Sequence, residues 1–157
     1  LGYRADNVKV IGCRVIRNGA VGIQGALVTN LVVRDCVVTH NNFRRFNPWW
    51  HAGGIKIIPD SHGVVERNES AYNHGPGIWF DWCDSGRPIT IADNHVHHNT
   101  AGEAGLFFET STHGRIVGNR VEHNFRRGIY LSASQDTTVE GNTVTGTWEK
   151  RGAIDLS

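Results

Sequence analysis

The sequence predicts an all-β fold, a parallel β-helix of about six coils that forms a single domain over residues 1–157. Three observations lead to this prediction. Glycine is enriched, with 19 residues in a chain of 157, above its usual share of about 7%. Short runs rich in Val, Ile and Thr alternate with Gly or Asn, whereas long helical patterns are missing. One short segment also recurs along the chain, which is typical of a solenoid.

The recurring segment begins with a Val or Ile run and ends in asparagine. Its copies occupy residues 10–18, 33–41, 65–73, 91–99 and 116–124, and a sixth begins at Val139. A second apolar run follows each copy after a loop of variable length. These runs are Gly22–Ile23, Gly54–Ile57, Gly77–Phe80, Gly105–Phe108, Gly128–Leu131 and Ala153–Leu156. Each repeat therefore carries two or three short strands.

A repeat of this size cannot bury its apolar face alone, so neighbouring copies must stack. If the chain winds once per repeat, each strand pairs in parallel with its copy about 4.8 Å away along the axis. One turn then aligns asparagines whose amides can hydrogen-bond along the axis. This row contains Asn68, Asn94, Asn119 and Asn142. Cys13 and Cys36 take the same position in the first two coils, where we expect small buried side chains.

Composition excludes several classes of function. The 16 Lys and Arg residues balance 15 Asp and Glu residues, so the chain lacks the basic stripe of a nucleic-acid-binding protein. No apolar run approaches the roughly 18 residues of a membrane span, and Leu1–Arg4 does not resemble a signal peptide. The three cysteines have neither zinc-site spacing nor a disulfide pattern. The sequence contains no methionine and ends abruptly at Ile154–Ser157, so we expect it to be a segment of a longer β-helix.

Alignment of the second runs places outward side chains in columns along the axis. One column contains Gln24, Lys56, Trp79, Phe107, Tyr130 and Asp155, and the next contains Ala26, Ile58, Asp81, Glu109, Ser132 and Ser157. Three adjacent aromatic side chains on the outside, with Trp82 nearby, predict an exposed platform for the apolar faces of sugars. The long insertion at residues 42–51, which carries Trp49 and Trp50, is expected to wall this groove.

Asp81 and Glu109 fall side by side on adjacent coils in this alignment. Two carboxylates at strand spacing repel each other, which pushes their pKa values apart. A separation of about 5 Å is that of a retaining glycosidase, in which one carboxylate attacks the sugar and the other transfers the proton. Alternatively, the two acids are solvated and have no function, or they are neutralised by Lys56 and Arg87. We favour catalysis because aromatic residues surround the pair.

Other polar groups are interpreted as structural. His95 and His97 share one face without a carboxylate at ligand spacing, so surface histidines are favoured over a metal site. The pairs Arg44–Arg45 and Arg126–Arg127 are interpreted as solvated loop charges. A column at the end of the repeat contains His40, Tyr72, His98 and His123.

The Asn-x-Val-x-x-Asn and Gly-Ile-x-Φ patterns resemble the repeat of the pectin-lyase-like superfamily over essentially the whole chain. This resemblance, with the general preference for right-handed crossovers, implies a right-handed helix. The superfamily holds hydrolases, lyases, epimerases and non-catalytic proteins, so the fold leaves function open. Residues 77–82 and 106–114 also resemble the β-xylosidases of glycoside hydrolase family 120. That likeness implies Asp81 as the nucleophile, Glu109 as the acid/base and His113 as a groove residue.

These inferences together predict a bacterial, extracellular or periplasmic, retaining glycoside hydrolase that acts on a poly- or oligosaccharide without a cofactor or metal. Its expected substrate-binding residues are Lys56, Trp79, Trp82, Phe107, His113, Tyr130, Trp49 and Trp50. One alternative is a lyase or epimerase acting on uronates, in which Lys56 or an arginine abstracts a proton. Ca²⁺ would then be held by Asp81, Asp84 and Glu109. The other alternative is a non-catalytic, glycan-binding or structural β-helix.

Overall fold

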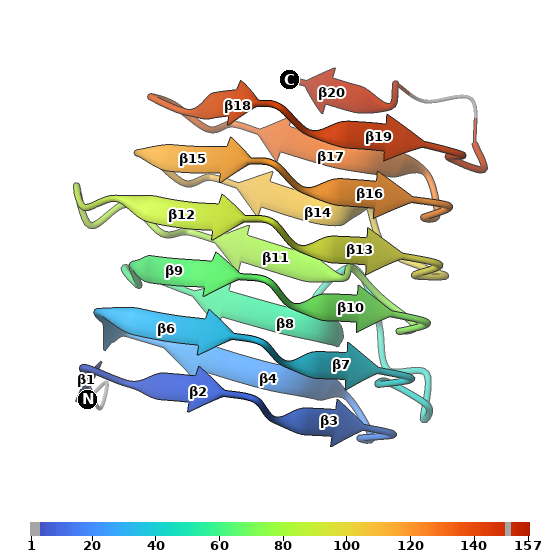
Figure 1. Ribbon diagram of the computed structural model, residues 1–157, viewed down its shortest axis with the longest axis horizontal. Helices are drawn as coiled ribbons and strands as arrows, with labels where there is room; N and C mark the ends of the chain where they lie inside the picture. Colours follow the sequence, from blue (N-terminus) through green and yellow to red (C-terminus); the bar gives the residue numbers. More distant parts are fainter. Residues whose placement is uncertain (1–3, 150–151) are drawn as a thin grey trace.

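The computed structural model describes residues 4–149 and 152–157, so the first three residues of the segment Leu1–Arg4 lie outside it. The described residues form a stack of coils along one axis, with residues 9–16 at one end of the stack and residues 138–145 at the other (Figure 1). All strand pairs within it are parallel. No helix long and apolar enough to cross a membrane occurs in this part of the chain. The predicted all-β solenoid is therefore confirmed.

Three six-stranded sheets surround the interior, and each coil adds one strand to each sheet. The first sheet contains β2 (Lys9–Ile11), β6 (Leu31–Arg34), β9 (Gly63–Glu66), β12 (Ile89–Ala92), β15 (Gly114–Val117) and β18 (Thr138–Glu140). The second sheet contains β3 (Arg14–Ile16), β7 (Val37–Thr39), β10 (Glu69–Ala71), β13 (His95–His97), β16 (Arg120–Glu122) and β19 (Thr143–Thr145). The third sheet contains β4 (Val21–Ala26), β8 (Gly53–Ile58), β11 (Ile78–Asp81), β14 (Ala104–Glu109), β17 (Arg127–Ser132) and β20 (Ile154–Leu156). A small extra pair joins β1 (Ala5–Asp6) to β5 (Val28–Thr29).

Alternate side chains of all three sheets meet in one apolar interior. Because successive side chains of a strand point to opposite faces, every second residue reaches the inside of the coil. The fully buried members include Val33, Val38, Ile55, Ile57, Ile78, Phe80, Ile91, Val96, Leu106, Phe108, Ile116, Val121 and Ile129. The same alternation sends the remaining side chains outward, where they form the columns that the sequence predicts.

The predicted asparagine row forms a hydrogen-bonded ladder at the corner between the first and second sheets. The side-chain oxygen of Asn94 accepts from both the backbone N–H and the side-chain amide of Asn68, each at 3.0 Å. Asn94 makes the same two hydrogen bonds to Asn119 on the next coil, and Asn119 makes them to Asn142 on the coil after that. Cys36 is buried in this row, as expected. Cys13 is exposed, contrary to expectation, because it lies between β2 and β3, which are the edge strands of their sheets among the described residues.

A second ladder, which the sequence reasoning missed, lies where the chain leaves the second sheet. The side-chain oxygen of Asn99 accepts from the backbone N–H of Asn73 at 3.1 Å and from its side-chain amide at 2.9 Å. The other members are Asn18, Asn41 and Asn124. Residues that precede the ladder asparagines have positive φ, for example 51° at Arg67 and 58° at His40. The ladders satisfy buried backbone groups at these sharp turns.

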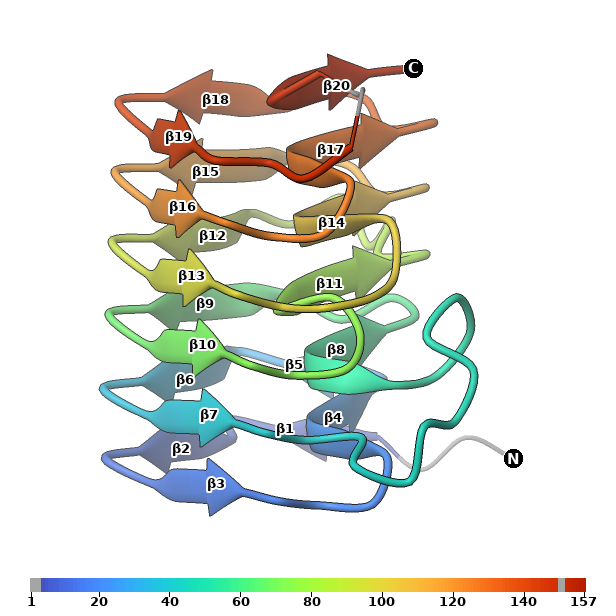
Figure 2. The same cartoon turned by 90° about the vertical axis from the view of Figure 1, so that its right-hand side faces the viewer.

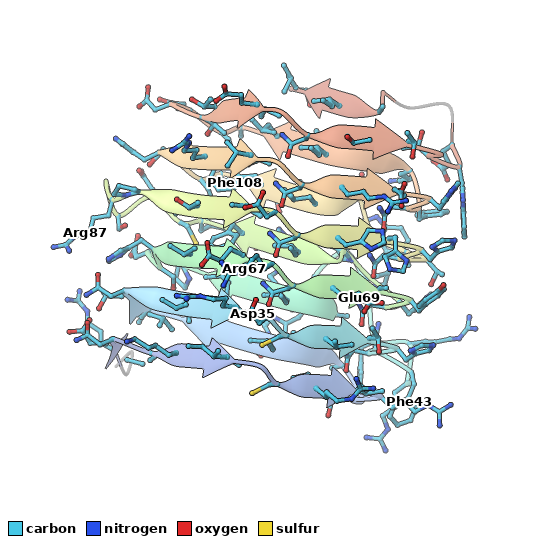
Figure 3. The ribbon with its side chains drawn as sticks, viewed as in Figure 1. Asp35, Phe43, Arg67, Glu69, Arg87 and Phe108 are labelled. Carbon is cyan, nitrogen blue, oxygen red and sulfur yellow. The ribbon has the colours of Figure 1, made fainter. Side chains whose placement is uncertain are left out.

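The insertion between β7 and β8 is a large departure from the regular coil. Figure 2 shows this loop projecting beside β8, away from the stacked coils. Asn42 anchors its start, because its fully buried amide donates to the carbonyls of Phe46 at 2.8 Å and His74 at 2.7 Å. In the turns that follow strands of the first sheet, by contrast, Asp35 and Arg67 form an ion pair at the surface (Figure 3).

Candidate active site

The third sheet aligns both outward columns as the repeat alignment predicts. Trp79 lies opposite Lys56 on one side and opposite Phe107 on the other. In the next column, Asp81 lies opposite Glu109, and Glu109 lies opposite Ser132 on β17. The predicted adjacency of the two carboxylate-bearing residues is therefore confirmed at the level of strand register.

The aromatic column is buried, and this corrects the expectation of an open platform. Trp79 and Phe107 are each 3% exposed and form, with Ala104 and the partly exposed Tyr130, an apolar cluster outside the main interior. The rings stack, with centroids 5.2 Å apart for Trp79 and Phe107 and 5.0 Å apart for Phe107 and Tyr130. The insertion and its neighbouring loops cover the outward face, which a column alignment of strands cannot reveal.

Lys56 connects the insertion to the column. Its side chain is almost fully buried, its Nζ lies 3.1 Å from Asp81 Oδ2, and it donates to the backbone carbonyl of Trp50. The ammonium also lies 3.1 Å from the centroid of the Trp79 ring. Burial lowers the pKa of Lys56, and the hydrogen bond and charge of Asp81 oppose that shift. Asp81 Oδ1 is buried and accepts no hydrogen bond from a described residue.

Glu109 has a different environment, although it lies directly opposite Asp81. Its Oε2 accepts a hydrogen bond from the indole N–H of Trp79 at 3.2 Å. Burial raises the pKa of Glu109, and the negative charge of Asp81 raises it further, whereas the Trp79 hydrogen bond and Lys56 oppose the shift. The pair is therefore asymmetric: Asp81 forms an ion pair with Lys56, whereas the pKa of Glu109 is raised by burial and by the charge of Asp81.

A cleft of about 350 Å³ opens beside Glu109. Its lining residues are Pro48, Trp49, Pro76, Trp79, Glu103, Phe107, Glu109, Tyr130 and Ser132. Two of them belong to the insertion, which confirms that this loop walls the groove. Lys56 and Asp81 are not in the lining. Asp81 lies one coil, and Lys56 two coils, toward the N-terminus from Glu109.

Glu103 completes the cleft and was not predicted. It accepts a hydrogen bond from the indole N–H of Trp49 at 2.7 Å and ion pairs from Arg126 and Arg127, each at 2.6 Å. Arg127 also contacts Asp155 at 2.5 Å, so its interpretation as a solvated loop charge is wrong. The sequence held no signal for Glu103, because it lies in a loop that the repeat alignment assigns to no column.

Besides Lys56, three predicted binding residues are absent from the lining of the cleft. Trp82 is 64% exposed and Trp50 is 75% exposed, and neither is in its lining. His113 is also exposed, with its Nδ1 2.9 Å from the hydroxyl of Thr112, which in turn donates to Asp84 at 2.7 Å. Within residues 4–149 and 152–157, no three His, Cys, Asp or Glu side chains gather as metal ligands. Asp84 therefore shares no such cluster with Asp81 and Glu109.

The histidines of β13 do have acidic partners, contrary to the sequence argument. His95 Nε2 lies 3.0 Å from Glu122 Oε2, and His97 Nε2 lies 3.4 Å from Glu69 Oε1. The sequence argument missed both carboxylates because they come from the neighbouring coils, on β16 and β10.

Comparison with known proteins identifies the fold at the level of a family. Residues 37–144, more than half of the chain, match the family model described as the right handed beta helix region. No curated protein and no solved structure matches the chain. The family description agrees with the right-handed winding that the sequence predicts. The chain therefore belongs to the right-handed β-helix family.

Proposed function

We propose that this β-helix is a carbohydrate-active enzyme, a retaining glycoside hydrolase with Asp81 as nucleophile and Glu109 as acid/base. The observation that carries the proposal is the pairing of two carboxyl groups in register but in unequal environments. A retaining enzyme needs one carboxylate ionised and the other protonated before attack. Lys56 stabilises the anion at Asp81, and burial with the charge of Asp81 raises the pKa of Glu109. The likeness to family 120 β-xylosidases supports the same assignment.

The proposed reaction has two steps. In the first, Glu109 gives its proton to the glycosidic oxygen, and Asp81 attacks the anomeric carbon to form a covalent glycosyl ester as the leaving group departs. In the second, Glu109 takes a proton from water, which attacks the same carbon and releases Asp81. The sugar lies in the cleft against Tyr130 and Trp49, with its anomeric carbon toward β11, the strand beside Glu109 that carries Asp81.

The composition of the cleft favours a neutral sugar over a uronate. Its lining includes Glu103 and Glu109 but no Lys, Arg or His. The nearby cations Arg126 and Arg127 are engaged by Glu103, and Lys56 is engaged by Asp81. A uronate carboxylate would therefore meet negative charge in the cleft, with the nearby cations already paired to acids. These features disfavour the alternative of a uronate lyase or epimerase.

Kinetics with an activated aryl β-xyloside and with xylobiose test the proposal. Glu109→Gln should slow xylobiose hydrolysis severely but spare the first step of the aryl xyloside, because an activated leaving group scarcely needs a proton. Asp81→Asn should abolish both reactions. Asp84→Asn, at an exposed acid of the following turn, is the matched control and should leave both rates unchanged.

Azide distinguishes the two roles. It should rescue Glu109→Gly with retained configuration and Asp81→Gly with inverted configuration. Full activity in Asp81→Asn or Glu109→Gln would contradict the assignment. An unsaturated product from the unaltered protein would indicate a lyase, and saturable binding of oligosaccharide without any product would indicate a glycan-binding module.

A further inference from the structure

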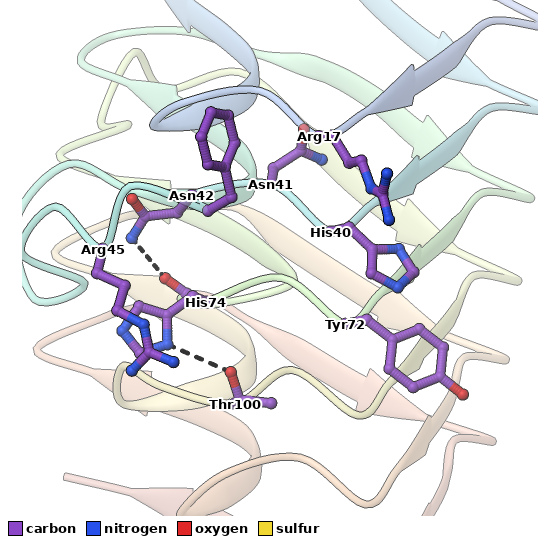
Figure 4. Close-up of a pocket in the computed structure, with 9 residues that line it drawn as sticks. Arg17, His40, Asn41, Asn42, Arg45, Tyr72, His74 and Thr100 are labelled. Carbon is purple, nitrogen blue, oxygen red and sulfur yellow. Dashed lines mark hydrogen bonds between the residues drawn. The ribbon is translucent and has the colours of Figure 1, made fainter.

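A second pocket, of about 630 Å³, lies where the chain turns from the second sheet toward the third (Figure 4). Its lining residues are Arg17, His40, Asn41, Asn42, Phe43, Arg45, Tyr72, His74 and Thr100. None of them lines the cleft beside Glu109. The insertion contributes Phe43 and Arg45 to this pocket, and Pro48 and Trp49 to the cleft. One loop therefore forms a wall of two separate concave sites.

The lining of this pocket is cationic and contains no acid. Arg17 and Arg45 are exposed, and neither forms an ion pair with a described residue. By contrast, Arg67, in the turn after β9, forms an ion pair with Asp35 at 2.9 Å. Burial lowers the pKa of His74, and the positive charge of Arg45 lowers it further. The potential in the pocket is therefore positive and is not neutralised by its own walls.

Rigid polar and aromatic groups form the rest of the pocket. The buried amide of Asn42 fixes the start of the insertion against the His74 carbonyl (Figure 4). The Tyr72 ring stacks on His40 with centroids 5.2 Å apart and on His98 with centroids 5.1 Å apart, so the wall that it forms is held in place. Thr100 contacts His74 Nδ1 at 3.3 Å. These contacts leave the guanidinium donors of the two arginines available to a ligand.

We propose that this pocket binds an anionic ligand whose carboxylate, sulfate or phosphate groups pair with Arg17 on one side of the pocket or with Arg45 on the other (Figure 4). A guanidinium can donate two parallel hydrogen bonds to such a group, and charge assistance makes these bonds strong. An organic part attached to the anion would pack against the exposed Phe43 and the Tyr72 ring. The proposal does not depend on the hydrolase reaction, because the two sites share no residue.

Calorimetric titration at low ionic strength tests the proposal with three probes: inorganic phosphate, digalacturonate and the neutral xylobiose. The ring signals of His40 and His74 in NMR spectra report whether a probe enters this pocket. The double substitution Arg17→Gln and Arg45→Gln should weaken binding of the anions at least tenfold. The matched control is Arg44→Gln, which removes the same charge from a neighbouring exposed residue that is not in the lining. Circular dichroism checks that each variant is folded.

Each result is decisive. Binding of either anion that shifts the histidine signals, is lost in the double variant and survives in Arg44→Gln supports the site. Tighter binding of digalacturonate than of phosphate identifies an organic acid as the ligand class, and the reverse identifies a free oxyanion. The proposal fails if neither anion binds below about 10 mM, if the double variant binds as tightly as the unaltered protein, or if Arg44→Gln weakens binding equally.

Discussion

The outward faces of the first and third sheets come from the same repeat but have opposite environments. On the third sheet, Lys56, Trp79 and Phe107 point away from the interior and are nevertheless almost fully buried. On the first sheet, the outward residues Lys9 and Arg115 are exposed. The strands of the two sheets follow the same rules of pairing, so the difference comes from the insertion and the loops that cover the third sheet. In this solenoid, loops turn an ordinary sheet face into a cleft.

The covering loops also change how much an ion pair contributes to stability. The ion pair between Lys56 and Asp81 lies on the covered face, with side chains 3% and 15% exposed. The ion pair between Arg67 and Asp35 lies at the surface, with side chains 48% and 47% exposed. Buried partners depend on each other because neither is solvated alone, whereas water solvates exposed partners once they separate. Matched substitutions on the two kinds of surface test this comparison.

The largest difference should separate two tryptophans of the same segment. Trp79→Ala removes a buried indole that packs between Lys56 and Phe107, so the free energy of unfolding should fall by about 3–5 kcal/mol. Trp82→Ala removes an exposed side chain and should cost less than about 0.5 kcal/mol. Urea denaturation measures both values. Equally small losses would mean that the loops do not cover the third sheet in solution.

The second largest difference is expected between the stability losses on breaking the buried and the exposed ion pair. Lys56→Met leaves the Asp81 carboxylate buried without its partner and should cost about 3 kcal/mol. Arg67→Met breaks the exposed pair with Asp35 and should cost less than about 1 kcal/mol. The same urea titrations provide the measurement. A loss for Lys56→Met as small as that for Arg67→Met would show that water reaches the Lys56 site and would weaken the proposed role of Asp81.

A smaller effect is expected within the insertion itself. Trp49→Ala removes the indole donor to Glu103 and the ring that faces Arg126, so we expect a loss of about 1–2 kcal/mol and a wider cleft. Trp50→Ala is the matched control, because Trp50 contacts Lys56 through its backbone carbonyl, which alanine keeps. It should cost less than about 0.5 kcal/mol. Equal losses would imply that the two side chains are equally exposed in solution.

The strand register of the candidate site could be predicted because it is periodic. Alignment of the Gly-Ile-x-Φ runs was enough to place Asp81 opposite Glu109, since each strand pairs with its copy in the next coil. The first asparagine ladder followed from the same period. The asparagine that ends each repeat has the same period, so the second ladder could have been predicted in the same way.

The environment of the site could not be predicted, because it depends on segments that do not repeat. Trp79 is buried because of the path that the insertion takes, and the alignment of the strands does not predict that path. Glu103 lies in another irregular loop and reaches the cleft only through the fold. The acidic partners of His95 and His97 belong to neighbouring coils, so a spacing rule within one segment misses them.

The smallest effect expected is a pH dependence of stability that arises at Glu109. The pKa of Glu109 in the folded chain is raised above its ordinary value of 4.5, so the folded state binds more protons than the unfolded state between these two values. Stability from this group is therefore complete below pH 4.5 and is lost as the pH rises through the folded pKa. Glu109→Gln removes that loss, so the variant should gain stability relative to the unaltered protein between pH 4 and pH 8. Asp81→Asn should reduce the gain, because the Asp81 charge helps to raise the pKa of Glu109. Urea titrations at several pH values measure the difference, and a difference that is flat or falls with pH would contradict the asymmetry of the pair.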